Sequence, residues 1–85
     1  MYTKNAECDV SMMEDAIIIM KKDDNSLHVF NETASLIWEY IESCSIDDMA
    51  KIIMTKYTDV SIDVVMQDIN NMINIMLEKN LIFVR

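Results

Sequence analysis

The sequence contains no glycine and no proline. Glycine-rich phosphate loops and the glycine fingerprint of dinucleotide-binding folds are therefore excluded as sites in this chain. Tight turns that need a positive φ must be made with Asn, Asp or Ser, since these residues tolerate such turns best after glycine. The turns of this protein should therefore depend on its asparagines and aspartates.

Cysteine and histidine are also scarce. The chain has two cysteines, Cys8 and Cys44, and one histidine, His28, and none of them lie at metal-ligand spacing. We interpret both cysteines as ordinary thiols and His28 as an ordinary strand residue. The acidic residues scatter over outer helix faces, without a sign of the concave pocket that paired-carboxylate catalysis needs. We therefore expect no enzyme activity, no metal and no cofactor.

Basic residues are outnumbered, with seven Lys and Arg against fifteen Asp and Glu and a formal net charge of −8. Such a chain repels phosphate backbones, so nucleic acid is not an expected partner. No apolar run approaches the roughly 18–20 residues of a membrane span, and the polar N-terminus does not resemble a signal peptide. We expect a cytoplasmic protein with reduced thiols and no membrane partner.

What the chain has is enough apolar sequence for a core. Its 85 residues are 52% hydrophobic, which favours a folded protein over a disordered one. This length suits one small domain with one core. We predict a single domain over residues 1–85, in which residues 1–8 form a polar lead-in.

Three stretches predict the strands of an antiparallel meander. The strongest is 16–20, where three consecutive isoleucines favour the β conformation, and its unbroken apolar run suggests that both faces are covered. Weaker strands are expected at 10–13 and 27–30. The segments 14–15 and 21–26 are the polar turns that connect them.

Three helices are expected after the strands, each preceded by a residue that can cap it. Asn31 precedes a helix over 32–42 that carries Trp38, the expected centre of the core. Ser45 precedes an amphipathic stretch over 46–57, and Ser61 precedes the longest helix, over 62–79. Asn80 can end that helix in the left-handed conformation. Residues 81–84 are either a short terminal strand or a tail packed on the core.

Two surfaces could bind a partner. The strand 27–30 ends the meander, so it should lie at a sheet edge with unpaired backbone groups. Either the segment 81–84 or a loop covers this edge, or an incoming peptide adds to it as a strand. The second surface lies on the last helix, where Met72 and Met76 fit either an adaptable groove or flexible core filling. Both alternatives remain open from the residues alone.

Several motifs resemble the PqqD-like family. The run Phe30-Asn31-Glu32-Thr33-Ala34, followed by Ile37-Trp38, is similar to that family's "LNETA…IW" signature. The segments 45–49 and 57–60 resemble its entry to the second helix and the spacer that follows. The pattern Asp68-Ile69, Met72-Ile73 and Asn80-Leu81-Ile82 is similar to its ending. The resemblance covers about residues 10–83.

The resemblance implies an α+β fold, a small winged helix-turn-helix-like domain with a three-stranded antiparallel sheet followed by three helices. It also implies a recognition element that binds the leader segment of a ribosomally made precursor peptide. In this mode the leader adds as a strand to the third strand and lies against the third helix, and the domain then presents the core peptide to a modifying enzyme. That partner enzyme is a radical SAM maturase or, in lasso-peptide systems, a leader peptidase.

We therefore predict a non-catalytic leader-peptide-binding protein, with a monomer favoured. The predicted peptide-binding residues lie on the edge strand and the last helix: Leu27, His28, Val29, Phe30, Asp68, Asn71, Met72, Ile75 and Met76. A winged-helix DNA-binding regulator is the first alternative, although its recognition helix would be acidic. A structural dimerisation subunit that pairs through the exposed edge is the second.

Overall fold

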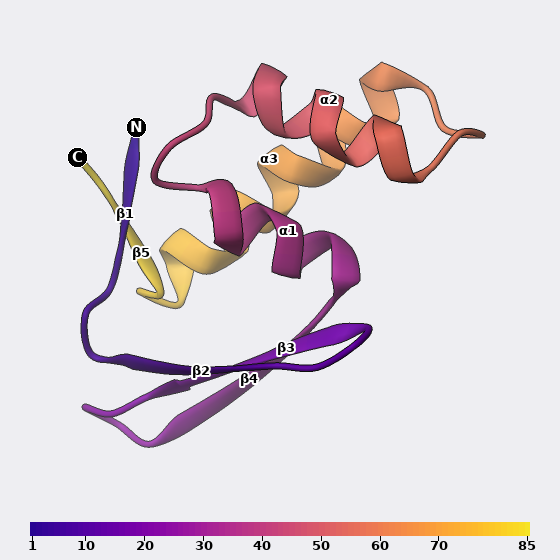
Figure 1. Cartoon of the computed structure of the whole chain (residues 1–85). Coiled ribbons are helices and arrows are strands. Elements are labelled where there is room, and N and C mark those ends of the chain that lie inside the picture. The colour runs from indigo at the N-terminus through magenta and orange to yellow at the C-terminus, as the bar shows by residue number, and fades with distance from the viewer.

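The computed structural model describes all 85 residues and confirms the expected α+β fold, with an antiparallel sheet of three strands followed by three helices (Figure 1). The elements in chain order are β1 (Tyr2–Lys4), β2 (Cys8–Met12), β3 (Ala16–Lys21), β4 (Ser26–Asn31), α1 (Glu32–Tyr40), α2 (Ile46–Lys56), α3 (Ile62–Glu78) and β5 (Ile82–Val84).

The main sheet has the order β2-β3-β4, so the predicted meander is correct and β4 lies at an edge. β3 pairs with β4 in a register that sets Ile17 opposite Phe30 and Ile19 opposite His28. Ile17 and Ile19 are completely buried on the face that carries the helices. The isoleucine run therefore anchors the sheet to the core.

The other face of the sheet is open, and here the expectation from the apolar run is wrong. Ile18 is half-buried, while Leu27 and Val29 are exposed. Figure 1 shows all three helices on one side of the sheet and no element on the other. An apolar run such as 16–20 is compatible with a strand that is covered on both faces. It is equally compatible with a strand whose outer side chains are shielded only by those of the neighbouring strands.

The three predicted caps begin the three helices. The side-chain oxygens of Asn31, Ser45 and Ser61 accept hydrogen bonds from backbone N–H groups three residues further on, at 3.0, 3.1 and 3.3 Å. Each cap residue has an extended backbone, as helix N-caps normally do. The chain direction at each helix start is thus fixed locally by the sequence.

Asparagine takes the place of glycine in the two left-handed positions. Asn25, in the β3–β4 turn, has φ 55°, and Asn80, after α3, has φ 58°. Asn is the residue after glycine that enters this region most readily. At Asn80 the backbone N–H of Leu81 then donates to the carbonyl of Met76 at 2.9 Å, which closes the helix end.

The core lies between the sheet and the helices. Trp38 packs in it as expected, on the inner side of α1, and the Nζ of Lys4 lies 5.3 Å from the centroid of its ring. α3 contributes Val65, Ile69 and Ile73 from one face. α1 contacts the sheet, and α2 packs on α3.

The first residues are a strand, which corrects their prediction as a polar lead-in. β1 pairs antiparallel with β5, setting Tyr2 opposite Val84 and Lys4 opposite Ile82. Of the alternatives for residues 81–84, the terminal strand is therefore the right one. Figure 1 shows these strands as a separate ribbon in which the two chain ends lie together. The C-terminal segment thus pairs with β1 and leaves β4 uncovered.

Candidate functional site

The hydrogen-bond ladder determines which backbone groups point out of the sheet. The N–H of Met13 donates to the carbonyl of Ala16 at 2.9 Å, and the N–H of Lys22 donates to the carbonyl of Glu7 at 2.8 Å. Bonded and non-bonded pairs alternate in an antiparallel ladder. The even-numbered residues of β3 therefore bond to β2, and its odd-numbered residues bond to β4.

The same alternation continues into β4. Since Ile17 and Ile19 bond toward β4, their partners Phe30 and His28 have their backbone groups directed into the sheet. The N–H and C=O groups of Leu27 and Val29 consequently point to the free edge. No strand lies beyond β4, so these two residues offer a short unpaired ladder.

The side chains of β4 divide between the two faces of the sheet. His28 and Phe30 lie half-buried on the helix side, with their rings stacked at 6.4 Å between centroids and an interplanar angle of 13°. Ser26 Oγ lies 2.9 Å from Nε2 of His28. Leu27 and Val29 turn to the open face. Of the four predicted strand residues, two present rings toward the helices and two present free backbone groups.

A groove of about 270 Å³, here called the edge groove, lies between the end of β4 and α3. Asn31 and Thr33 line it on one side, and α3 supplies the other wall with Asp68, Asn71, Met72 and Ile75. These four α3 residues were all predicted site residues. The structure thus brings them together beside the edge strand.

Met76 is the predicted residue that the structure removes from this surface. Its side chain is completely buried in the hydrophobic core, so a place in a groove is wrong. Met72, one turn earlier, is only partly buried and lines the edge groove. Of the two alternatives for these methionines, core filling therefore holds for Met76, whereas Met72 borders the groove.

A larger pocket of about 350 Å³, here called the acidic pocket, adjoins the edge groove and shares Asn31, Thr33 and Asp68 with it. Its apolar walls are Ile53, Tyr57, Val60 and Val65, and its other carboxylates are Asp15 and Glu32. The two hollows form one continuous surface from α3 to the β2–β3 turn.

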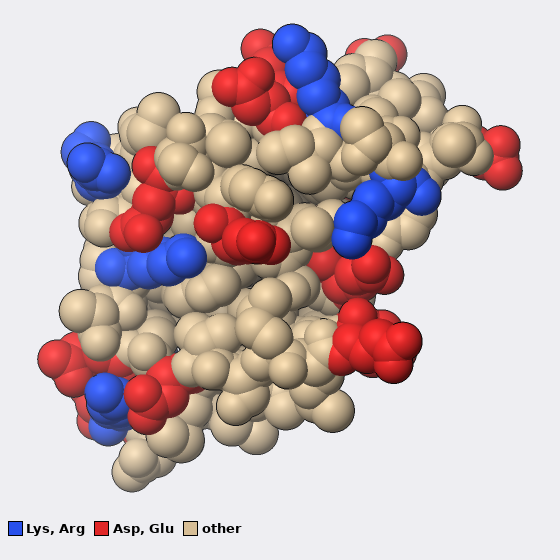
Figure 2. Space-filling view, in the orientation of Figure 1, with Lys and Arg blue, Asp and Glu red and all other residues tan.

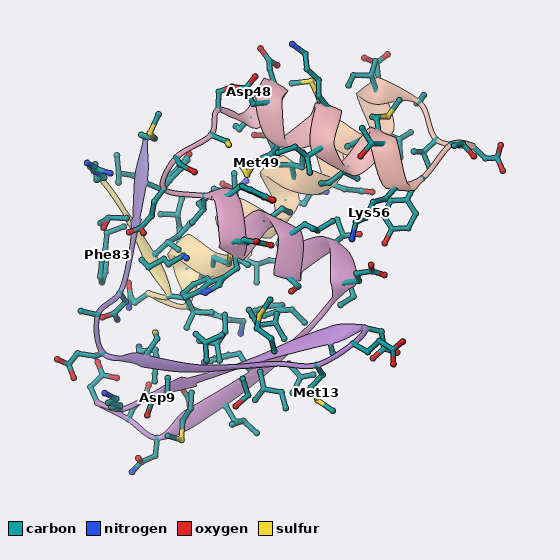
Figure 3. The ribbon with its side chains drawn as sticks, in the orientation of Figure 1. Asp9, Met13, Asp48, Met49, Lys56 and Phe83 are labelled. Atoms are coloured by element: carbon teal, nitrogen blue, oxygen red, sulfur yellow. The ribbon has the colours of Figure 1, made fainter.

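One cation lies close to these carboxylates. Nζ of Lys56 is 3.7 Å from Oε1 of Glu32, whereas Asp15 and Asp68 have no ion-pair partner. Figure 3 shows Lys56 extending from α2 toward the beginning of α1. Figure 2 shows acidic side chains on the side of the molecule where the β2–β3 turn lies. The pocket therefore has a net negative charge.

The remaining reactive groups form no second site. No group of three His, Cys, Asp or Glu residues could hold a metal ion. Burial raises the pKa of the Cys8 thiol above its ordinary value, which keeps it protonated and a poor nucleophile at neutral pH. No helix is long and apolar enough to cross a membrane.

The sequence interpretation missed the acidic pocket. Its residues come from the β2–β3 turn, the start of α1, the end of α2, the following loop and α3. No periodic pattern joins positions so far apart in the chain. The only signals were Asp68, which was already a predicted site residue, and the spacer Tyr57-Thr58-Asp59-Val60, whose first and last residues line the pocket.

The fold is similar to that of two solved proteins. One is TbiB1 in complex with the TbiA(beta) leader peptide, with a TM-score of 0.83, 14% sequence identity, and coverage of 98% of this chain and 99% of that chain. The other is lasso peptide synthetase B1 complexed with the leader peptide, with a TM-score of 0.83, 15% identity and coverage of 98% of both chains.

No curated protein matches this sequence, but one protein family does. The family described as "Coenzyme PQQ synthesis protein D (PqqD)" matches residues 16–82, from β3 to the first residue of β5. The matched part includes β4, α3 and nearly all of the residues around both hollows. The chain belongs to the PqqD family.

Proposed function

We propose that this protein binds the leader segment of a ribosomal precursor peptide by strand addition to β4 and presents the peptide to a modifying enzyme. The observation that carries the proposal is the free edge of β4 beside the edge groove. The backbone groups of Leu27 and Val29 would bond the leader, while α3 would contact its side chains. Main-chain bonds give affinity in this mode, and adjacent pockets give specificity.

The walls of the edge groove offer a bound peptide both apolar surface and hydrogen-bonding groups. Met72 and Ile75 offer partly exposed apolar surface, and Asn71 and Asp68 offer hydrogen-bonding groups at the same place. Successive side chains of a strand point to opposite faces. Only every second leader residue would therefore enter the groove, and the others would lie over the open face near Leu27 and Val29.

The family and the fold support a peptide partner. The chain belongs to the PqqD family, and both similar structures are complexes with a leader peptide. The charge of α3 argues against a DNA-binding regulator, because Asp63, Asp68 and Glu78 outnumber Lys79 at its end. The role is non-catalytic, with a radical SAM maturase or a leader peptidase as the class of enzyme served.

Amide hydrogen exchange on the free and peptide-bound protein tests this binding mode. The probe is a synthetic peptide that carries the leader sequence of the candidate precursor peptide. The amides of Leu27 and Val29 should exchange rapidly in the free protein and become protected when the leader binds. The amides of His28 and Phe30 should change little, because the β3 ladder already protects them.

This alternating pattern is specific to strand addition on β4. The proposal would be contradicted if the changes in amide exchange were confined to regions away from β4 and α3. Unchanged exchange at Leu27 and Val29 under saturating leader would contradict it too. Protection of both amides without peptide, together with a mass that rises with concentration in light scattering, would instead indicate self-pairing through this edge.

A further inference from the structure

We infer that the acidic pocket is a specificity site for one basic side chain, Arg or Lys, of the peptide bound on β4. This inference rests on the proposed function and extends it, because it names the chemistry of a leader residue outside the strand-paired segment. Three properties of the pocket lead to it: its apolar walls, its unpaired carboxylates and its position at the end of the edge strand.

The walls suit the stem of a long side chain. Ile53 and Val65 are almost completely buried, and Val60 is partly exposed at the pocket. Tyr57 adds an aromatic ring to the same wall. The methylene groups of Lys and Arg bury well against such surfaces while the charged head stays at a polar rim. A guanidinium could also stack on the Tyr57 ring.

The carboxylates suit the head of that side chain. Asp15 and Asp68 belong to the pocket and have no ion-pair partner, and only Glu32 has Lys56 near it. A purely apolar leader residue would leave these carboxylates unpaired beside a less solvated surface, which costs free energy. A basic residue gains a charge-assisted contact there. Charge complementarity therefore selects a cation.

The location makes the pocket accessible to the same peptide. Asn31 is the last residue of β4 and lines both hollows, and Asp68 is their common wall on α3. Asp15 directly precedes Ala16, which pairs with Asn31 in the sheet. A peptide that follows the free edge of β4 past Asn31 therefore leads into the acidic pocket. The basic residue should lie at a fixed distance from the strand-paired segment.

The test is a selection of random 16-residue peptides displayed on phage, carried out in parallel on three proteins. These are the wild type, the Asp15→Asn/Asp68→Asn double variant and the Val29→Pro variant. Wild-type protein should enrich peptides with Arg or Lys at one fixed position beside an extended apolar segment. The double variant should enrich peptides that have no preferred Arg or Lys at that position. The Val29→Pro variant should enrich neither kind of peptide.

The most enriched wild-type peptide then serves as a defined probe, measured in 150 mM salt to limit long-range attraction. Asp15→Asn should weaken binding of this peptide by about fivefold or more, but binding of the same peptide with norleucine at the basic position by less than about twofold. Glu39→Gln is the matched control, since Glu39 is exposed on α1 and borders neither hollow. It should change neither affinity.

The outcomes separate the two proposals. Peptides that depend on Val29 but show no fixed basic position, or an Asp15→Asn effect equal to that of Glu39→Gln, would overturn the acidic pocket and leave strand addition intact. Failure of wild-type protein to enrich any peptide, or enrichment unaffected by Val29→Pro, would overturn strand addition and this inference with it. The norleucine peptide tests the pocket without altering the protein.

Discussion

The side chain of Asn31 accepts a hydrogen bond from the backbone N–H of Ala34 at 3.0 Å, so the residue that ends the free edge of β4 also begins α1. Asn31 borders both the edge groove and the acidic pocket as well. One side chain thus joins the folding of the first helix to the geometry of the proposed binding surface.

Replacement of Asn31 by Ala should lower the free energy of unfolding by about 1 kcal/mol, because α1 loses its cap. Asn31→Asp retains a capping oxygen and should cost less. Urea unfolding followed by circular dichroism measures both. An Asn31→Ala variant as stable as wild type would show that α1 does not depend on this cap.

Two neighbouring proline substitutions should separate binding from folding. Val29→Pro removes an N–H that points to the free edge, so it should weaken leader binding by about tenfold or more while the fold remains. His28→Pro removes an N–H that bonds to β3, and should destabilise the sheet by several kcal/mol, on the order of 3. Isothermal titration and thermal unfolding measure the two effects. A larger loss of stability in Val29→Pro than in His28→Pro would mean that the ladder has the opposite alternation, and equal losses would contradict the alternation assigned here.

The two methionines of α3 should respond differently to truncation. Met76 is completely buried, so Met76→Ala should lower the free energy of unfolding by about 2–5 kcal/mol. Met72 lines the edge groove and is only partly buried, so Met72→Ala should weaken leader binding with a smaller loss of stability. Chemical denaturation and peptide titration of each variant provide the comparison. A binding defect limited to a stably folded Met76→Ala protein would contradict this assignment.

The strand β1 should loosen in acid. The backbone N–H of Lys4 and the hydroxyl of Thr3 donate to Glu42 at 3.0 and 3.1 Å, and these bonds hold the pKa of its carboxyl below its ordinary value of 4.5. A carboxyl with a depressed pKa in the folded state stabilises the fold above its ordinary pKa and loses this effect as pH falls through the folded value.

The stability difference between wild type and Glu42→Gln should therefore be largest near neutral pH and vanish in acid. Urea midpoints between pH 7 and pH 3 measure it, and amide exchange in β1 and β5 locates it. The matched control is Glu39→Gln, whose carboxyl accepts no such bonds. A difference that stays constant over this pH range would assign the effect of Glu42→Gln to packing and not to ionisation.

Local chemistry in the sequence was sufficient to place most of the elements. The isoleucines of 16–20 and the caps Asn31, Ser45 and Ser61 act within one strand or one helical turn, so their effects could be read without the fold. The left-handed position of Asn80 was predicted by name, and Asn25 lies in the 21–26 turn, where the absence of glycine required Asn, Asp or Ser. The edge position of β4 followed from the order of the strands.

Other features depend on residues that are distant in the chain. Tyr2–Lys4 is polar and short, and forms a strand only because β5 lies beside it to accept its hydrogen bonds. The apolar stripe of α3 contains both Met72 and Met76, so it could not show which of them is buried. The boundary between core and groove is set by the rotation of α3 against α1, α2 and β5. That rotation comes from packing between helices and strands.

The sequence by itself determined the family resemblance, the order of elements from β2 to α3 and the residues that begin each helix, since these are written in short stretches of chain. Only the tertiary structure decided which backbone groups of β4 are free, because that depends on the register with β3. It alone also brought Asp15, Glu32 and Asp68 to one pocket. Their proximity results from the packing of the β2–β3 turn, α1 and α3, which no local pattern encodes.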